Sequence, residues 1–258
     1  MKELTLDLDH SGVADPVFRA ALYQGPRLEP PLLSDRARHV AIRTWTDRAR
    51  SEYVGVMIVR KLHGLLVDLN APRDVQELAL RMLLDEQRHA GACAAAVEAL
   101  GGAPSVVFDL DELRQERSTE PLEAQLIELL VGTYACGEVV AHALLRHAVR
   151  ALPPSGFRDV LRHIARDEVL HARFGPALLA AARSGSTDAW LPWPGEGVVR
   201  GLVERQRAWM ATRDVVEPTD AQLFEDPVDR DSLLAVGVTA PGPFRIAYLR
   251  AVSRLREP

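Results

Sequence analysis

The sequence predicts an all-α protein built on four long helices, with additional helices at its C-terminus. Apolar residues recur at helical spacing from residue 34 to residue 184, interrupted only near proline or glycine. The segments between these breaks are about 30 residues each, or about 45 Å at 1.5 Å per residue. Two of them also carry a Glu followed three residues later by a His, within LLDEQRHAG and IARDEVLHARFG.

Composition narrows the class of protein. The chain has 258 residues, of which 47% are apolar, so it can bury a sizeable core. Its net charge is −5 and its basic residues are scattered, which argues against a nucleic-acid partner. We find no signal peptide and no apolar run of about 20 residues, so we expect a cytoplasmic protein without a membrane partner. Cys93 and Cys136 form no CxxC motif and suit a reducing compartment.

The N-terminal part begins with a lead of residues 1–33 that ends in GPRLEPPLL and is expected to lie extended. The first helix starts after Ser34, a suitable N-cap, and stops near Asn70, where Asn-Ala-Pro follows. The second helix starts near Pro72, since proline suits a first helical position, and ends at Gly101-Gly102.

The second pair of helices follows a connection, residues 103–117, that is long enough to cross the end of a bundle. The third helix is expected from about Ser118 to Leu152, where a proline pair stops it. The fourth spans residues 155–184, and its Gly175-Pro176 step predicts a kink. The short loops make each pair antiparallel.

The C-terminal part contains an amphipathic segment at residues 198–215, a loop with Pro218 and Pro227, and a short helix at residues 244–256. These elements could pack on the bundle, close over a pocket or form a subunit contact, and the sequence leaves these alternatives open. The predicted domains are the extended lead 1–33, a four-helix bundle over 34–184, and a helical extension over 185–258 packed on the bundle.

The two Glu-x-x-His motifs predict metal binding. Residues i and i+3 share one face of a helix, so Glu86 and His89 point the same way, as do Glu168 and His171. The partner helices place two more glutamates at the same depth. Glu86 and Glu168 each lie 15 residues after the loop that precedes their helix. Glu52 and Glu138 lie a similar distance before the same two loops, which brings each of them to about the level of a motif.

Charge balance explains how such a cluster could be buried. Four carboxylates and two imidazoles in a core would be costly if left unpaired, because burying one ionised group costs several kcal/mol. Two divalent cations bring four positive charges against four glutamates. Carboxylate and imidazole donors suit iron or manganese, whereas the thiolates that favour structural zinc are missing from these motifs.

Neighbouring residues are candidates for supporting roles. Asp85 and Asp167 could each accept the second ring N–H of the histidine on the other motif helix. His142 lies one turn after Glu138 and could be an added ligand, a donor behind the ligands or a surface histidine. Tyr134, one turn before Glu138, could be a redox-active or hydrogen-bonding phenol near the metals, or an ordinary core tyrosine.

Two further features lie close to the predicted ligands. Three glycines flank the lone glutamates and could leave room for oxygen or substrate, or allow close helix packing: Gly55, Gly132 and Gly137. His163 is one residue out of register with the second motif and should face away from it.

The complete pattern resembles the ligand set of ferritin-like di-iron carboxylate proteins. Within that group it is similar to bacterial arylamine N-oxygenases, multicomponent monooxygenases, acyl-carrier-protein desaturases and the small subunit of ribonucleotide reductase. The resemblance implies a ferritin-like four-helix bundle over residues 34–184, in which Glu86 and Glu168 bridge two irons. It assigns one iron to Glu52, Glu86 and His89, and the other to Glu138, Glu168 and His171. The four glutamates would also be the catalytic residues.

The resemblance implies an O2-activating, non-haem di-iron oxidoreductase of the oxygenase, hydroxylase or N-oxygenase type. We expect two Fe ions, with Mn or a mixed Mn/Fe pair as alternatives, and a small organic substrate, as in specialised metabolism. Electrons would come from a separate ferredoxin or reductase, or from the substrate itself, and the long helices suggest a homodimer. A ferritin- or rubrerythrin-like iron-handling or peroxide-detoxifying protein is the alternative, and a bundle with a structural or lost metal is a third. The long C-terminal extension and the lack of a rubredoxin-type cysteine site favour the oxygenase.

Overall fold

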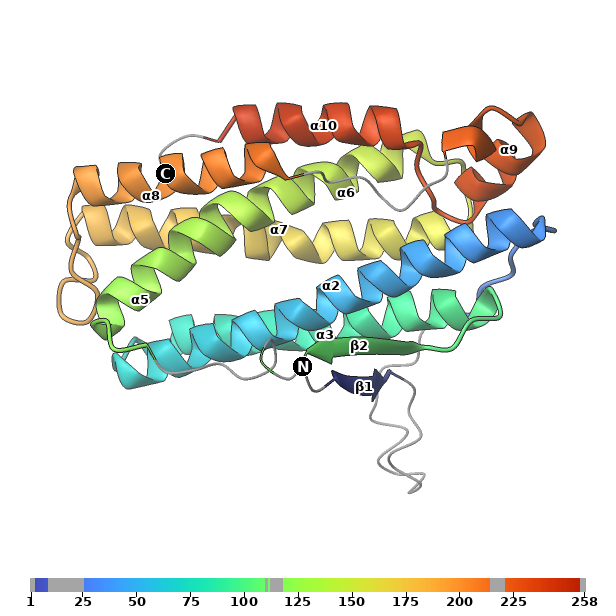
Figure 1. Cartoon of the computed structure of the whole chain (residues 1–258). Helices are drawn as coiled ribbons and strands as arrows, with labels where there is room; N and C mark the ends of the chain where they lie inside the picture. The colour runs from blue at the N-terminus through green and yellow to red at the C-terminus, as the bar shows by residue number, and fades with distance from the viewer. Residues whose placement is uncertain (1–2, 9–25, 110, 112–117, 214–220, 256–258) are drawn as a thin grey trace, which may run out of the picture.

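The computed structural model describes residues 3–8, 26–109, 111, 118–213 and 221–255, and these are mostly helical (Figure 1). Four long helical segments run along the molecule. They are α2 (Asp35–Asp68), α3 (Arg73–Ala99), a third segment made of α5 (Leu122–Leu129), η1 (Leu130–Glu138) and α6 (Val139–Ala151), and α7 (Gly156–Arg183). The predicted all-α class is confirmed for this part of the chain.

The ends of these segments follow local signals in the sequence. The hydroxyl oxygen of Ser34 accepts a hydrogen bond from the backbone N–H of Ala37 at 3.2 Å, which confirms the predicted N-cap of α2. Ser155 caps α7 in the same way. Gly101 and Gly185, which follow α3 and α7, have φ values of 85° and 78°, a left-handed conformation that glycine adopts without strain.

The third segment differs from the uninterrupted α-helix that we expected. Its middle, η1, is a nine-residue π-helix that ends at Glu138. Gly175 of α7 lies against it, because a Cβ added to Gly175 would lie 2.8 Å from the carbonyl oxygen of Leu130 and 2.5 Å from Cβ of Tyr134. The close approach of α7 to η1 therefore requires glycine. Helix α7 continues through Pro176.

The third segment is also long and apolar enough to span a membrane, although we expected no such stretch. The span runs over Leu122–Ala151, and 44% of its most apolar window is buried inside the protein. Core helices of soluble proteins can be equally long and apolar, so this is weak evidence for a membrane, and the arrangement is consistent with a core helix.

A small antiparallel sheet covers one side of α2. Strand β1 (Glu3–Asp7) pairs with β2 (Ser105–Asp109), with Leu6 opposite Val106 (Figure 1). Strand β1 lies in the lead that we expected to be extended, whereas β2 falls in a segment predicted only as a connection. Residues 9–25 of the lead and 112–117 of the connection lie outside the described residues.

The C-terminal part contains α8 (Glu196–Thr212), the 3-10 helix η2 (Ala221–Phe224), α9 (Pro227–Ala235) and α10 (Pro241–Ser253). Helix α9 corrects the prediction of a loop around Pro227: Asp226 caps the helix and Pro227 takes its first position, where proline is favourable. Pro218 lies outside the described residues.

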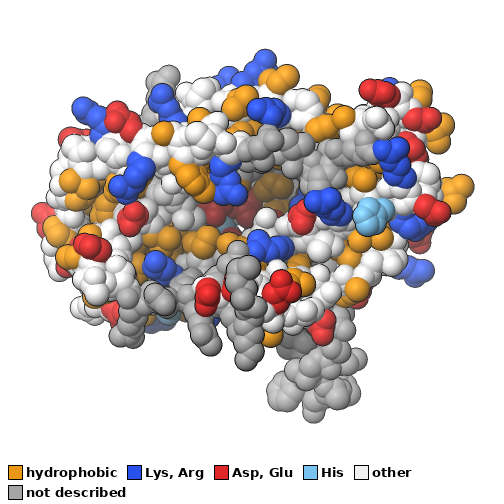
Figure 2. Space-filling view, viewed as in Figure 1, with side chains coloured by type: hydrophobic (Ala, Val, Ile, Leu, Met, Phe, Trp, Pro, Cys, Tyr) orange, Lys and Arg blue, Asp and Glu red, His pale blue; other side chains and the backbone are white. Residues whose placement is uncertain are grey.

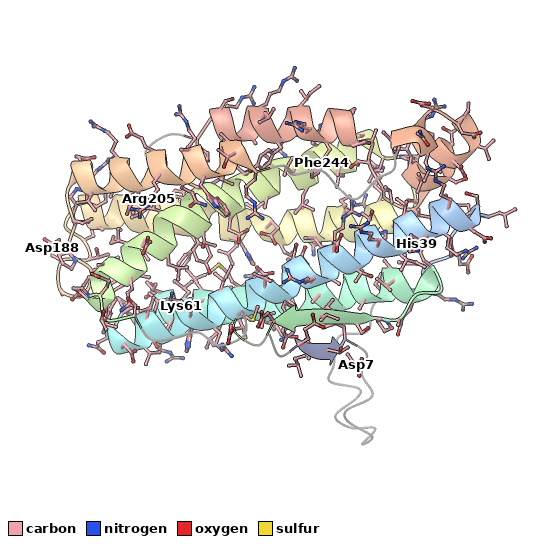
Figure 3. The ribbon with its side chains drawn as sticks, in the orientation of Figure 1. Asp7, His39, Lys61, Asp188, Arg205 and Phe244 are labelled. Carbon is pink, nitrogen blue, oxygen red and sulfur yellow. The ribbon has the colours of Figure 1, made fainter. Side chains whose placement is uncertain are left out.

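Specific contacts tie these helices to the rest of the molecule. The Tyr248 hydroxyl in α10 donates a hydrogen bond to the carbonyl oxygen of Met210 in α8 at 2.8 Å. The indole N–H of Trp45 in α2 donates to the carbonyl oxygen of Val236 at the end of α9, also at 2.8 Å. Figure 3 shows Arg205 on α8 and Phe244 on α10 along one side of the molecule, and Lys61 on the opposite side. The division into three domains stays a prediction.

Buried apolar residues form two clusters along the bundle. One includes Leu62, Met82, Tyr134 and Phe174, and the other includes Trp45, Cys93, Phe157 and Ile164. In α3 and α7 the predicted ligands fall between residues of the two clusters. The polar centre is therefore a layer between two apolar cores.

Candidate metal centre

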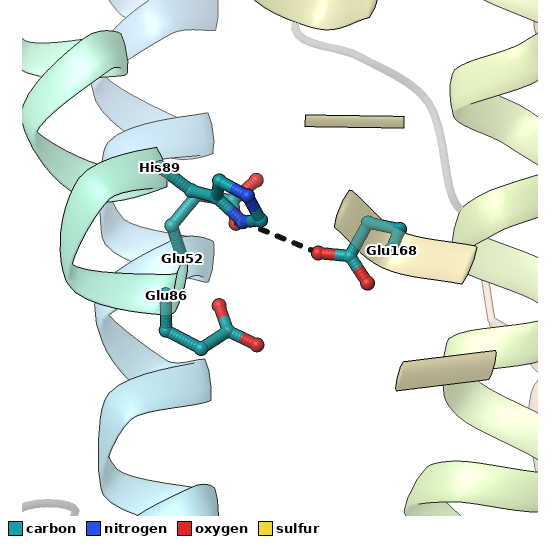
Figure 4. A group of neighbouring side chains, drawn as sticks. All are labelled: Glu52, Glu86, His89 and Glu168. Atoms are coloured by element: carbon teal, nitrogen blue, oxygen red, sulfur yellow. Dashed lines mark ion pairs between the residues drawn. The ribbon is translucent and has the colours of Figure 1, made fainter. Parts of the chain in front are cut away.

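Three helices bring a first group of donors together at this layer. Glu52 comes from α2, Glu86 and His89 from α3, and Glu168 from α7 (Figure 4). One ligand atom from each of these residues lies within 4.8 Å of the others, close enough to hold a metal ion. Figure 2 shows a hollow near the middle of the molecule with acidic side chains at depth and basic ones near its edge.

A second group lies beside the first. It consists of Glu86, Glu138 at the end of η1, and His171 of α7, with donor atoms again within 4.8 Å of one another. Glu86 belongs to both groups. Both Glu-x-x-His pairs and both lone glutamates therefore meet in one place, as the loop-to-loop counting indicated.

Glu168 lies between the two histidines. Its Oε1 is 3.3 Å from Nδ1 of His89, and its Oε2 is 3.4 Å from Nδ1 of His171. The same His89 nitrogen lies 3.3 Å from Oε2 of Glu52, and that of His171 lies 3.1 Å from Oε1 of Glu86. Each imidazole thus turns Nδ1 toward two carboxylates, the position that a metal ligand would take.

The buried donors lack hydrogen-bond partners. His89 and His171 are fully buried, and none of their four ring nitrogens makes a hydrogen bond within the described part of the chain, despite the short distances. Oε2 of Glu168 is also without a hydrogen bond there. A buried polar group left unpaired costs about 1–3 kcal/mol. Carboxylate and imidazole donors in this state fit a metal ion, which would supply the missing partner.

The pKa values of the metal-free cluster also indicate that it lacks positive charge. Burial raises the pKa of Glu86 to about 7, helped by the charges of Glu52 and Glu168 and opposed by His171. Burial raises the pKa of Glu138 well above its ordinary value. Without metal ions, Glu86 and Glu138 therefore hold a proton more tightly than exposed glutamates do, whereas the neighbouring imidazoles lower the pKa of Glu168 despite its burial.

The imidazoles shift in the direction that their carboxylate neighbours favour. Burial alone would lower the pKa of His89, but the carboxylates of Glu168 and Glu52 raise it to about 10. For His171, burial is likewise outweighed by Asp85 and the neighbouring glutamates, and its pKa rises to about 11. Protons on these rings occupy the place that a cation would otherwise take.

The two aspartates lie behind the histidines in the predicted crosswise arrangement. Oδ2 of Asp85 is 3.9 Å from Nε2 of His171, and Oδ2 of Asp167 is 3.7 Å from Nε2 of His89. These distances are slightly longer than a hydrogen bond. Each aspartate is placed to orient the imidazole on the other helix.

Each aspartate is itself flanked by arginine or histidine side chains that we did not predict there. Arg88 and Arg81 lie 3.6 and 4.0 Å from carboxylate oxygens of Asp85. Arg166 and His163 lie 3.3 and 3.4 Å from those of Asp167. His163 belongs to neither donor group. Most of these residues are three or four positions from their aspartate, a spacing that could have indicated the contacts.

Tyr134 is buried next to this layer. Its hydroxyl has no hydrogen-bond partner among the described residues, and its ring packs edge-on against Phe174. Burial, and then the charges of Glu138 and Glu86, raise its pKa well above the ordinary value. The burial of Tyr134 and its electrostatic coupling to Glu138 and Glu86 are compatible with a phenol close to the metals.

His142 belongs to neither donor group. It lines a groove between α6 and α7 instead, and burial followed by the charge of Arg146 lowers its pKa. The structure therefore gives no support for His142 as an added ligand.

The three glycines near the lone glutamates differ in their surroundings. A Cβ at Gly55 would collide with the carboxylate of Glu86, so this glycine leaves room for a predicted ligand. Gly132 and Gly137 have only ordinary contacts, at 3.7 Å to Gln206 and 3.5 Å to a backbone oxygen. The space at Gly55 is thus filled by the Glu86 carboxylate rather than left for oxygen or substrate.

No protein-family model, curated protein or solved structure matches this chain. The fold and the donor groups define a helical protein with a buried carboxylate and histidine cluster that could hold a metal ion. The cluster is compatible with a di-iron site.

Proposed function

We propose that this protein is an O2-activating oxidoreductase of the ferritin-like di-iron type that acts on a small organic molecule. One observation carries the proposal: the two donor groups share Glu86, and Glu168 directs one oxygen toward each histidine. Two carboxylates placed between two sets of ligands are an arrangement for a pair of metal ions rather than for one.

Iron is supported by the kind of donors. Carboxylates and imidazoles suit iron or manganese, and the buried thiols of Cys93 and Cys136 belong to neither donor group. Four glutamates also balance two divalent cations, which removes most of the cost of burying them. Manganese or a mixed pair would satisfy the same donors.

Each side chain has a defined part in the proposed site. Glu52 and His89 would hold one ion, Glu138 and His171 the other, and Glu86 and Glu168 both. When bound, an iron pair would supply electrons for the reduction of O2. Asp85 and Asp167 would keep the imidazoles in one orientation and tautomer. The apolar clusters on both sides would keep water from the reacting atoms.

The packing of the C-terminal helices favours oxidation of an enclosed substrate over iron storage. Helix α8 packs on η1, and α10 packs on α6, so both cover the segment that carries Glu138. A covered centre restricts which molecules reach the metals. Iron handling or peroxide removal, the second candidate, needs no such cover.

Metal loading and oxygen mixing test the proposal. The metal-free protein is loaded with ferrous iron under anaerobic conditions, the metal content per chain is measured, and the sample is mixed with O2 while absorption is recorded. We expect two irons per chain and a coloured transient whose decay accelerates with a substrate. Slow accumulation of many irons per chain would instead identify a storage protein.

Single substitutions assign the ligands. Glu86→Ala and His171→Ala should each lower the iron content, because each removes a donor from a group. His142→Ala is the matched control and should retain two irons. Unchanged iron content in both ligand variants would refute the assignment.

A further inference from the structure

A groove of about 330 Å³ between α6 and α7 is lined by basic side chains. His142, Arg146 and Arg150 come from α6, and Arg162 and Arg166 come from α7. The groove lies close to the metal centre, because α6 begins directly after Glu138 and α7 carries Glu168 and His171.

The positive charge of the groove is only partly balanced. Arg162 lies 3.2 Å from a carboxylate oxygen of Asp159, and Arg166 lies 3.3 Å from Asp167. Arg146 and Arg150 form no ion pair with any residue that the structure describes. Each helix also places two arginines four residues apart, an arrangement in which like charges repel each other. A chain with a net charge of −5 thus gathers cations here against that repulsion.

The rest of the lining is apolar. Val149 from α6 and Ala165 and Val169 from α7 complete the groove. Val169 is 41% exposed although it is aliphatic and lies next to Glu168. A ligand that fits would place an anionic group among the guanidinium groups and an apolar body on these side chains.

We propose that this groove binds a small organic anion, a carboxylate or phosphate joined to an apolar body. Guanidinium groups bind both oxyanions through paired, charge-assisted hydrogen bonds. Arginines on two facing helices can hold one such group from both sides. Binding of this kind needs neither a metal nor O2, so the proposal stands or fails independently of the proposed function.

Calorimetric titration with phenyl phosphate, benzoate, neutral benzyl alcohol and inorganic phosphate tests the groove. We expect the full-length wild type to bind phenyl phosphate or benzoate at least tenfold more tightly than benzyl alcohol or inorganic phosphate. The variant Arg146→Gln/Arg150→Gln should bind the organic anion at least tenfold more weakly. Arg162→Gln/Arg166→Gln, which alters the other wall, should show the same loss.

The matched control is Arg207→Gln/Arg254→Gln, which removes two exposed positive charges from α8 and the end of α10. It should bind like the wild type, and circular dichroism should show equal helix content in all variants. Equal affinity in the wild type and both groove variants would overturn the proposal and place the anion elsewhere, including at the metal ligands that all variants retain. Absence of binding to the wild type at millimolar concentration would overturn it too, as would equal affinity for inorganic and phenyl phosphate.

Discussion

The carboxylate of Glu86 occupies space that a side chain at position 55 would otherwise fill. Glu86 is also the residue that the two donor groups share. A helix interior normally favours alanine over glycine by about 1 kcal/mol. At residue scale, Gly55 gives up this helix stability so that a predicted ligand can lie against the backbone of α2.

Gly55→Ala should therefore weaken metal binding without unfolding the protein. The added methyl group displaces the flexible end of Glu86, and shifts of this kind near a metal typically lower affinity about 10–100-fold. Gly64→Ala on the same helix meets nothing within 4 Å and should raise stability by up to about 1 kcal/mol with unchanged metal affinity. Metal titration and thermal unfolding of both variants measure this, and equal metal affinities would contradict it.

Metal binding should release protons near pH 7. The pKa values of His89 and His171, about 10 and 11 in the metal-free protein, lie above this pH, so both rings carry a proton that a metal must displace. Affinity should rise as the pH rises from about 6 to 8, and about two protons should leave the imidazoles per metal pair, in addition to those that Glu86 and Glu138 release. Calorimetry in buffers of different ionisation enthalpy counts them. Binding that is independent of pH would disprove this account.

At the scale of elements, η1 and α7 are in close contact near the metal centre. The π-helix ends at Glu138, and Gly175 lies against its backbone. π-Helical segments are rare and occur often at functional sites. The contact therefore sets where Glu138 points relative to the donors on α7.

Gly175→Ala should destabilise the protein by about 1–3 kcal/mol, because the new methyl group meets backbone atoms that cannot rotate away. It should also lower metal affinity by shifting η1. Gly201→Ala in α8, where the space is open, is the control and should be neutral or stabilising. Urea unfolding measures both variants, and a neutral Gly175→Ala would show that η1 adapts freely.

Trp45 joins α2 to the end of α9. Trp45→Phe removes the hydrogen bond to the carbonyl oxygen of Val236 in a fully buried place and should cost about 1–3 kcal/mol. Trp209→Phe, at a position that is 50% exposed, should change stability by less than about 0.5 kcal/mol. Thermal unfolding monitored by circular dichroism compares them. If both substitutions change the free energy of unfolding equally, the hydrogen bond between Trp45 and Val236 contributes little to stability.

At the scale of the whole molecule, the donor layer lies between the two apolar clusters of the core. Without metal, this layer holds carboxylates and imidazoles whose ring nitrogens lack hydrogen bonds within the described residues. These unpaired buried groups reduce stability until a metal supplies their partners. Stability should depend on the metal more than on any single apolar contact.

Loading with ferrous or manganous ions should raise the unfolding temperature. A ligand at 100 times its Kd stabilises the native state by about 2.7 kcal/mol. A chelator should reverse the shift, and Glu168→Ala should show much less of it, since Glu168 faces both histidines. Differential scanning calorimetry under anaerobic conditions measures these effects. If the unfolding temperature of the wild type does not change on metal loading, the result would argue against a buried metal pair.

The sequence by itself determined the features that depend on local periodicity. Helix ends at Ser34 and Ser155 follow from capping chemistry. The grouping of Glu52 and Glu138 with the two motifs follows from the constant rise of a helix and from short loops. The ferritin-like identity of the bundle, the O2 chemistry and a homodimer stay predictions.

Only the tertiary structure decided the features that depend on distant partners. The π-helix η1 is matched to a glycine on another helix, and β2 pairs with a strand about a hundred residues earlier in the chain. The gathering of guanidinium groups in the α6–α7 groove follows from how the side chains of two helices meet. Sequence spacing fixes which face of a helix a residue occupies, but long-range packing decides what that face meets.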